Sequence, residues 1–353
     1  MTLARLVLAC AMAVSAPVLG AIVATPQALA GEEEMCRIKD SRLDEISGLA
    51  YSTRHDGVIW THNDSGGGAR VYALDDETCE VLAVLRIKGV PARDMEAIAA
   101  GANSRGERVL WLADIGDNLS ERTTISLYEV REPEQLRNET VGARRFELTY
   151  PSGAQDAEAL MALPDSPRVW IITKGILGGS VWKPRDALIK RFVTPLRKIG
   201  EEQGFVTDAS MAPDASRYVV RDYAEARIYA GTPVGRLLTS LPLPDQVQGE
   251  AITWTPDGTS LVVASESDDR LIRVDVPEEG LPKSAGGSDG EEPAEPAADT
   301  QEDPTPQPVI PKAVEPVSQL GNAAVVALIL GGATFVLATV VVIIVVIVRD
   351  RRA

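Results

Sequence analysis

The sequence predicts an all-β protein of the β-propeller class, with five blades of four strands each. Three observations support this prediction. A short motif recurs five times, each copy is followed by short β-branched and aromatic runs, and one spare strand-like segment precedes the first copy. Four strand-like runs repeated at about 40–50 residues are typical of propeller blades.

The recurring motif places one polar side chain among small apolar residues. Aligned on their third position, the copies contribute Ser47, Glu96, Glu158, Asp208 and Glu250. The step from Glu96 to Glu158 is the longest and would admit a sixth blade if it contained a further hairpin. Five blades is the preferred count, and six is the alternative.

Each motif is followed by two further runs rich in β-branched and aromatic residues, such as VIWTHND at 58–64 and ARVYALD at 69–75. Such runs, bounded by Gly, Asp and Pro, indicate strands and turns. Four units then show a last run, and the fifth lacks one. The segment 36–39 (CRIK) is expected to supply that missing strand and so close the ring.

The two ends of the chain predict export and membrane attachment. Residues 1–30 combine an early Arg5, an apolar run and small residues at the end, as in a secretory signal peptide. Residues 321–348 are predicted to form a transmembrane helix, because they include a long uncharged apolar run that is followed by arginines at 349–353.

The order of these segments predicts a single-pass protein of the plasma membrane. The propeller would be an N-terminal ectodomain of residues 31–276 outside the cell. Residues 277–320, rich in Pro, Asp and Glu, would be a disordered acidic stalk, and residues 349–353 a short cytoplasmic tail.

The formal net charge of −16 argues against nucleic acid or anionic lipid as a partner and favours a cation. Two cysteines, Cys36 and Cys79, remain after signal cleavage in an oxidising compartment, so a disulfide between them is plausible. The sequence does not decide whether the two cysteines reach one another, since the gap could be too wide for a disulfide if both begin outer strands of neighbouring blades.

In a propeller the first strand of each blade lines the central channel, so the five aligned residues would form one ring. Several carboxylates on one axis raise one another's pKa or recruit a cation. Oxygen ligands without cysteine or histidine favour a hard ion such as Ca²⁺. The metal ligands are therefore predicted as Ser47, Glu96, Glu158, Asp208 and Glu250. The alternative is that Arg93, Lys174, Arg221 or backbone amides neutralise these carboxylates.

The second strands run antiparallel to the first and should end at the same channel mouth. A calcium-dependent hydrolase could use Asp64 or Asp114 as a base there, and Asn63, Lys174 and Arg221 to hold an anionic substrate. The motif DIGDN at 114–118 marks this mouth, where Gly116 is expected to adopt a positive φ.

These motifs resemble those of bacterial, mainly actinobacterial, exported β-propeller proteins related to the "esterase-like activity of phytase" family. The resemblance covers the ectodomain and implies hydrolysis of esters. The residues that carry it are SGLAYS (47–52), WTHNDSG (60–66), DMEAIA (94–99), ADIGDN with Arg122 (113–122), LYEVREP (127–133), ITKG (172–175) and QGEAI (248–252). A looser likeness to five-bladed calcium-dependent apyrases implies an axial calcium ion.

Two functions follow from these expectations. The preferred one is a surface module that binds an anionic ligand or a partner protein, with a structural cation in the channel. The alternative is a calcium-dependent hydrolase of phosphate or carboxyl esters. An open cation position faced by Lys174 and Arg221 would favour the hydrolase, whereas salt bridges filling the mouth would favour the binding module.

Overall fold

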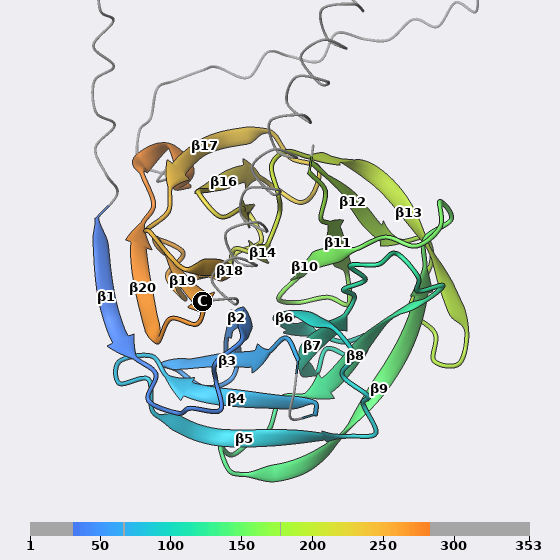
Figure 1. Cartoon of the computed structure of the whole chain (residues 1–353), viewed down its shortest axis with the longest axis horizontal. Helices are drawn as coiled ribbons and strands as arrows, with labels where there is room; N and C mark the ends of the chain where they lie inside the picture. Colours follow the sequence, from blue (N-terminus) through green and yellow to red (C-terminus); the bar gives the residue numbers. More distant parts are fainter. Residues whose placement is uncertain (1–30, 66–67, 177, 283–353) are drawn as a thin grey trace, which may run out of the picture. The chain divides into compact units, whose positions relative to one another are not determined.

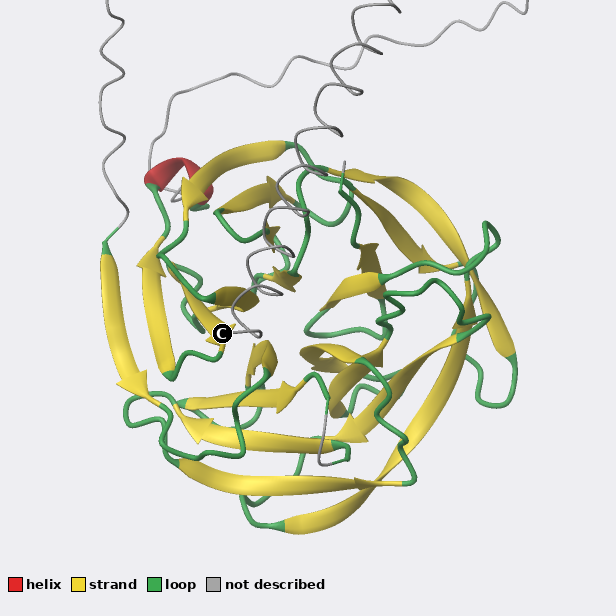
Figure 2. Cartoon of the chain, in the orientation of Figure 1, coloured by secondary structure: helices red, strands yellow, loops and turns green. Residues whose placement is uncertain are grey.

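The structure, a computed structural model, describes residues 31–65, 68–176 and 178–282. These residues form an all-β fold with twenty strands and one short 3₁₀ helix (Figure 2). Among the described residues, no helix is long and apolar enough to cross a membrane. The predicted signal peptide, the transmembrane helix at 321–348 and the tail at 349–353 lie outside the described residues, as does the stalk beyond residue 282.

The strands form five groups of four, which we call blades, around a common centre, as expected for a β-propeller (Figure 1). Within each blade, neighbouring strands are antiparallel. Blade 1 contains β2 (Ile46–Tyr51), β3 (Val58–Asn63), β4 (Arg70–Asp75) and β5 (Val81–Lys88); blade 2 contains β6 (Met95–Ala102), β7 (Arg108–Asp114), β8 (Ile125–Arg131) and β9 (Glu139–Thr149); blade 3 contains β10 (Ala157–Ala162), β11 (Val169–Thr173), β12 (Gly179–Pro184) and β13 (Val193–Glu202); blade 4 contains β14 (Asp208–Met211), β15 (Arg217–Arg221), β16 (Glu225–Ala230) and β17 (Leu237–Pro242); blade 5 contains β18 (Gln248–Trp254), β19 (Ser260–Glu266), β20 (Arg270–Asp275) and the N-terminal β1 (Glu32–Arg37).

The ring closes through β1, which pairs antiparallel with β20. Cys36 lies opposite Leu271, so the closing strand begins earlier than the predicted segment 36–39. The long second repeat hides no extra hairpin in the described residues, because β9 alone has 11 residues and loops take up the rest. The blade count of the described fold is therefore five rather than six.

The outer strands of three blades join in a way that the repeat does not predict. β9 pairs parallel with β5 on one side and with β13 on the other, so blades 1, 2 and 3 form one continuous twelve-stranded sheet. Blades 4 and 5 remain separate four-stranded sheets.

Hydrophobic clusters lie between neighbouring blades and hold the ring together. The described residues contain five of them, one at each junction. Trp60, Trp111 and Trp254 are among the largest fully buried side chains, in line with the expected packing role of the aromatic residues in the strands. Burial of each large apolar side chain contributes roughly 1.5–3 kcal/mol to stability.

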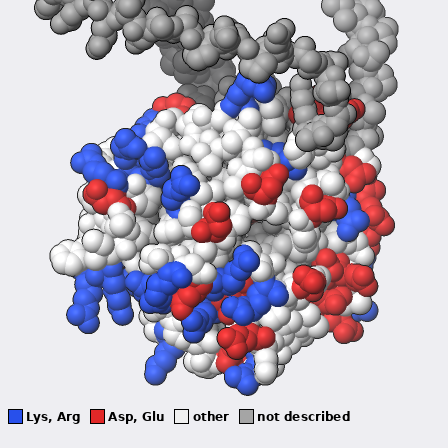
Figure 3. Space-filling model, turned by 180° about the vertical axis from the view of Figure 1, so that it is seen from behind, with Lys and Arg blue, Asp and Glu red and all other residues white. Residues whose placement is uncertain are grey.

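Charge is distributed unevenly over the face of the propeller seen in Figure 3. Basic side chains gather on the side of blades 2 and 3, at the left of that view, and acidic ones on the side of β1 and β20, at the right. The net charge of −16 therefore conceals a basic region.

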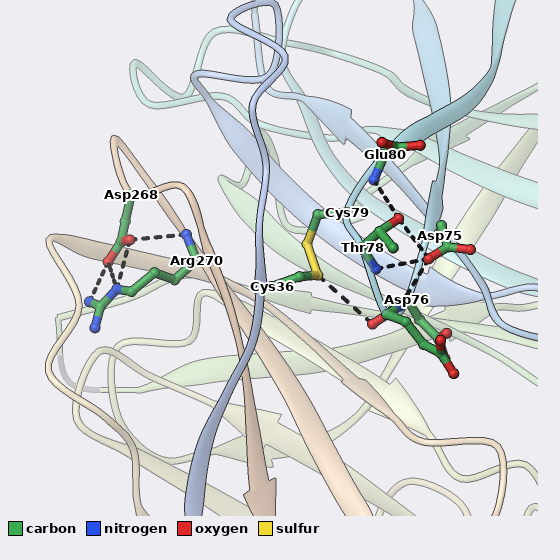
Figure 4. Close-up of a disulfide and its surroundings, with 9 residues drawn as sticks. Cys36, Asp75, Asp76, Thr78, Cys79, Glu80, Asp268 and Arg270 are labelled. Atoms are coloured by element: carbon green, nitrogen blue, oxygen red, sulfur yellow. Dashed lines mark hydrogen bonds and ion pairs between the residues drawn. A yellow bond between two sulfur atoms is a disulfide. The ribbon is translucent and has the colours of Figure 1, made fainter.

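A disulfide between Cys36 and Cys79 ties the closing strand β1 to blade 1 (Figure 4). Cys79 lies in the turn between β4 and β5, and the Asp75 carboxylate accepts hydrogen bonds there from the backbone N–H and the hydroxyl of Thr78. The Cα–Cα distance of 5.6 Å is normal for a disulfide. The cysteines are therefore close enough to bond, and they come from neighbouring blades.

The described fold continues past Val276, where the sequence analysis ends the ectodomain. A 3₁₀ helix, η1 (Glu278–Gly280), follows, and its Gly280 is buried. A Cβ at Gly280 would lie 2.7 Å from Val276 Cγ1 and 3.1 Å from Ile228 Cδ1. The described fold thus extends beyond the ectodomain boundary predicted at residue 276.

Candidate functional site

The first strands β2, β6, β10, β14 and β18 lie nearest the centre (Figure 1). The second strand of each blade runs antiparallel to the first and ends beside the start of the first strand. Asn63 at the end of β3 therefore lies opposite Ile46, and Asp114 at the end of β7 lies opposite Met95. The first strands therefore begin, and the second strands end, at the same channel mouth, as the sequence analysis predicted.

A β-bulge sets the direction of the aligned polar residue in four of the five blades. The strand register shifts between Ile46 and Gly48, and again at the corresponding positions of blades 2, 3 and 5. A bulge leaves one extra residue unpaired and re-aims its side chain. The unpaired residues are Ser47, Glu96, Glu158 and Glu250.

Blade 4 has no such bulge, and Asp208 pairs directly with Arg221. Asp208 is buried, and its carboxylate accepts hydrogen bonds from the backbone N–H groups of Ala209 (2.8 Å) and Ile252 (2.7 Å). Burial raises the pKa of Asp208, and these two N–H groups oppose that rise. Asp208 therefore joins blade 4 to blade 5 and does not offer free ligand oxygens to the ring.

Arg221 is also fully buried, in contrast to its predicted role at the mouth. Its guanidinium donates to the Ala251 carbonyl (3.0 Å) and to Gln246 Oε1 (3.1 Å). Burial lowers the pKa of Arg221 to about 10, although the nearby Asp208 and Glu250 favour its charged form. A guanidinium enclosed in this way does not reach a substrate in the channel.

Lys174 neutralises Glu158, with its Nζ 2.8 Å from Oε1. The same ammonium lies 5.0 Å from the centre of the Phe205 ring. Burial raises the pKa of Glu158 to about 7, although Lys174 opposes the rise. Burial lowers the pKa of Lys174, but Glu158 outweighs it and the net shift is upward. This side of the mouth thus follows the predicted alternative in which Lys174 neutralises a carboxylate.

Glu250 accepts hydrogen bonds on one oxygen from the Tyr223 hydroxyl (3.1 Å) and Gln248 Nε2 (3.0 Å). Its other oxygen, Oε2, is buried and has no hydrogen-bond partner among the described residues. Glu250 therefore keeps one acceptor oxygen free at the mouth.

The other side of the mouth holds three carboxylates close together, which we call the carboxylate triad: Asp64, Asp94 and Glu96. One oxygen from each lies within 4.8 Å of the others. In the described part of the chain, none of the three forms an ion pair with a basic side chain. Ser47 Oγ adds a hydroxyl 3.3 Å from Glu96 Oε2. The triad is formed between blades 1 and 2 and not by one residue from every blade.

The environment of the triad disfavours three negative charges. Burial raises the pKa of Asp64 to about 7, with repulsion from Asp94, Glu266 and Glu45 adding to it. Burial and repulsion from Glu158 raise the pKa of Glu96 far above its usual value. Such a group must either retain protons or bind a cation.

The motif DIGDN begins at Asp114, the last residue of β7, and its Gly116 passes close to the triad. A Cβ at this position would overlap the Glu96 carboxylate and lie 2.5 Å from Asp94 Oδ2. Gly116 is not among the described glycines with positive φ, so the expectation of a left-handed turn was wrong. Glycine is required because the backbone passes directly beside two carboxylates of the triad.

The rest of the DIGDN loop is held by Arg122. Its guanidinium lies 2.7 Å from Asp114 Oδ1 and donates to the carbonyls of Gly116 and Asp114. Asp117 N–H in turn donates to Asp156 Oδ1 at 2.7 Å. Asp114 is therefore paired and only 1% exposed, which does not suit the free base predicted for the hydrolase.

A cavity of about 370 Å³ adjoins Asp64 and is lined also by His62, Asn63 and Met95. Asn63 Nδ2 donates to the Arg42 carbonyl at 2.7 Å, whereas its Oδ1 is buried without a partner among the described residues. His62 Nε2 and Asp64 Oδ1 are also buried and unpartnered there. Three buried polar atoms of residues that line this cavity thus lack a partner among the described residues.

The sequence analysis expected Asp94 near the ring but did not name it as a metal ligand, and it gave Gly116 only a role in a turn at the mouth. Asp94 stands two positions before Glu96, and residues two apart on an extended chain share a face. That spacing was the available signal. No sequence pattern indicated that Gly116 approaches from the next hairpin.

We expect the cation-free protein to lose stability as the pH rises from about 4 to about 7. In this window the unfolded chain has ionised Asp64, whose usual pKa is 3.8, while the folded protein keeps the proton until about 7. Melting curves between pH 4 and 8 in chelator would measure the loss. Asp64→Asn should flatten the curve, and an unchanged slope in that variant would contradict the assignment.

Comparison with known proteins adds a distant structural likeness only. No family model matches the chain, and no curated protein sequence matches it. One similar solved structure is the "Crystal Structure of Mitotic Checkpoint Complex", with 15% sequence identity and a TM-score of 0.35. The match covers 65% of this chain and 63% of that chain, so this protein matches less than two thirds of that chain's length. Likeness at this level implies nothing about function.

Proposed function

We propose that the protein is a membrane-anchored extracellular binding module with a structural cation at the channel mouth. One observation carries this proposal. Three of the side chains predicted for a hydrolase are already engaged, since Lys174 pairs with Glu158, Asp114 pairs with Arg122 and Arg221 is buried. The membrane anchor rests on the apolar run within residues 321–348 and the arginines that follow it.

The carboxylate triad fits a hard divalent cation. Its donors are all oxygens, which suits Ca²⁺ better than zinc. Asp64 Oδ1 is buried with no partner among the described residues, and a cation would satisfy it. We propose that Asp64, Asp94 and Glu96 hold the ion, with Ser47 close by. The ion would link blades 1 and 2 at the mouth.

The cavity beside Asp64 is the proposed ligand position. It borders Asp64 of the triad, and His62 and Asn63 also line it. An anionic group of a ligand in this cavity would bind to the proposed cation at the side that borders Asp64. Binding there requires no catalytic group.

One observation favours the calcium-dependent hydrolase as a second candidate. Asp64, whose pKa is raised to about 7 by burial, borders a cavity large enough for a small ester. A carboxylate with a pKa near neutrality suits a general base. In that case Asp94 and Glu96 alone would hold the cation, which would polarise the ester, and Asp64 would accept a proton from water.

Calorimetric titration of the chelator-treated full chain with CaCl₂ tests the cation. We expect one-site binding that weakens at least about tenfold, or about 1.4 kcal/mol, in Asp94→Asn and in Glu96→Gln, because each variant removes one ligand charge. Asp165→Asn is the matched control, since Asp165 is exposed and distant from the triad in sequence.

Absence of binding to the unaltered protein would overturn the cation proposal and leave the triad protonated. Equal weakening in Asp165→Asn would show a general charge effect and would also overturn it. Calcium-dependent cleavage of a chromogenic phosphate or carboxyl ester that is lost in Asp64→Asn would favour the hydrolase over the binding module.

A further inference from the structure

A second cavity lies away from the channel mouth, between blades 2 and 3. Its volume is about 460 Å³. Trp111 and Phe146 of blade 2 and Trp170 of blade 3 form its aromatic lining. The two tryptophans are buried, and their Nε1 atoms have no hydrogen-bond partner in the described part of the chain. An indole N–H can only donate, so both tryptophans lack an acceptor.

The rim of this cavity is strongly basic. Five basic residues line it, whereas the acidic lining residues are Glu129 and Asp186. Arg144 pairs with Glu129 at 3.0 Å. The other four form no ion pair within residues 31–65, 68–176 and 178–282. They are Arg168, Lys183, Arg185 and Arg197.

Exposed apolar side chains stand beside the basic rim. The loop between β12 and β13 runs from Arg185 to Phe192, and Ile189 and Phe192 are 53% and 69% exposed. Lys190 and Arg191 lie between them in the sequence. Exposed apolar side chains that gather beside a pocket and are flanked by cations are typical of protein interaction surfaces.

We propose that this basic aromatic cavity binds an acidic segment of a partner protein that carries a bulky apolar side chain. Carboxylates of the segment would pair with the rim arginines and lysine, and the apolar side chain would enter the cavity. The aromatic lining and the exposed loop argue for such a peptide over a plain polyanion, which would need only the charges.

This inference extends the proposed binding function to a second surface and does not depend on the cation. Most of the residues that line the cavity belong to blades 2 and 3, the side of the propeller on which basic side chains gather in Figure 3. Because the partner segment is acidic and this side of the propeller is basic, electrostatic attraction would also speed their association at low salt. Calcium binding at the triad and peptide binding here can therefore succeed or fail separately.

Fluorescence anisotropy with two labelled peptides tests the inference on the full chain. One peptide is the acidic sequence EDEDFEDED, and the other replaces its phenylalanine with alanine. We expect the phenylalanine peptide to bind more tightly, and its binding to weaken when NaCl is raised from about 50 to 500 mM. The double variant Arg185→Glu/Arg197→Glu should weaken it at least about tenfold.

The control is Arg54→Glu/Arg86→Glu, which reverses the charge of two exposed arginines in blade 1. Neither arginine forms an ion pair in the described structure. This control should bind as the unaltered protein does. Equal weakening in both double variants would show a general charge effect and overturn the proposal. Equal affinity for the two peptides would also overturn it, because the cavity would then recognise charge alone. So would a lack of binding by the unaltered protein.

Discussion

Replacing Gly249 with alanine is expected to destabilise the protein by about 3 kcal/mol. A Cβ there would overlap Arg221 Nη2 and lie 2.8 Å from both Arg221 Cζ and Gln246 Oε1. Arg221 is fully buried, so it has no space into which to move. The variant would either break its hydrogen bonds to Ala251 and Gln246 or distort β18. Since about 1 kcal/mol shifts the melting temperature of a domain of this size by roughly 2–4 °C, thermal unfolding should occur roughly 6–12 °C lower.

Gly142→Ala is the matched control for this prediction. Gly142 also lies in a strand, β9, and a Cβ there would meet nothing within 4 Å. Its φ is not in the positive range, so alanine should be neutral or slightly stabilising. If Gly249→Ala melted like the unaltered protein, Arg221 would not be packed against the backbone at residue 249.

Removing the disulfide is expected to cost about 4 kcal/mol. Cys36 and Cys79 are 43 residues apart, and cross-linking a loop of this length lowers the entropy of the unfolded chain by a corresponding amount. The variant Cys36→Ser/Cys79→Ser should therefore unfold roughly 8–16 °C lower than the unaltered protein. Because the disulfide holds β1, amide exchange in β20 should also become faster.

Treatment with a reductant separates the stabilisation that comes from the disulfide bond from that which comes from packing of the two cysteine side chains. Dithiothreitol should lower the melting temperature of the unaltered protein to nearly that of the double serine variant. It should not change the variant itself. A melting temperature that is the same with and without reductant in both proteins would contradict a stabilising role for the bond.

The repeat predicted the strand order because each blade carries the same alternation of strand and turn signals. It also predicted the closing strand, since the fifth unit lacked one and the N-terminus offered one. It did not predict the parallel pairing of β9 with β5 and β13. Such pairing depends on how far an outer strand extends past its own blade, which no local pattern records.

The candidate site was harder to predict because equivalent positions in the repeat do not have equivalent environments. Ser47, Glu96, Glu158 and Glu250 each occupy a bulge, whereas Asp208 does not. Without a bulge, the Asp208 carboxylate accepts a hydrogen bond from the backbone N–H of Ile252 in the next blade. The five predicted ring residues thus have four different environments. Glu96 belongs to the triad with Ser47 beside it, and Glu158 pairs with Lys174. Glu250 accepts hydrogen bonds from Tyr223 and Gln248, and Asp208 is a buried structural aspartate.

The parallel pairing of β5, β9 and β13 has a consequence for how the ring can open. Two junctions, on either side of blade 2, carry backbone hydrogen bonds between outer strands. Blade 4 has no such pairing, and side-chain contacts such as Asp208 to the Ile252 N–H join it to blade 5. The propeller is thus an arc of three blades with paired outer strands, completed by two separately hydrogen-bonded blades, and the seams that border blade 4 depend on side-chain contacts such as the Arg227–Glu202 ion pair.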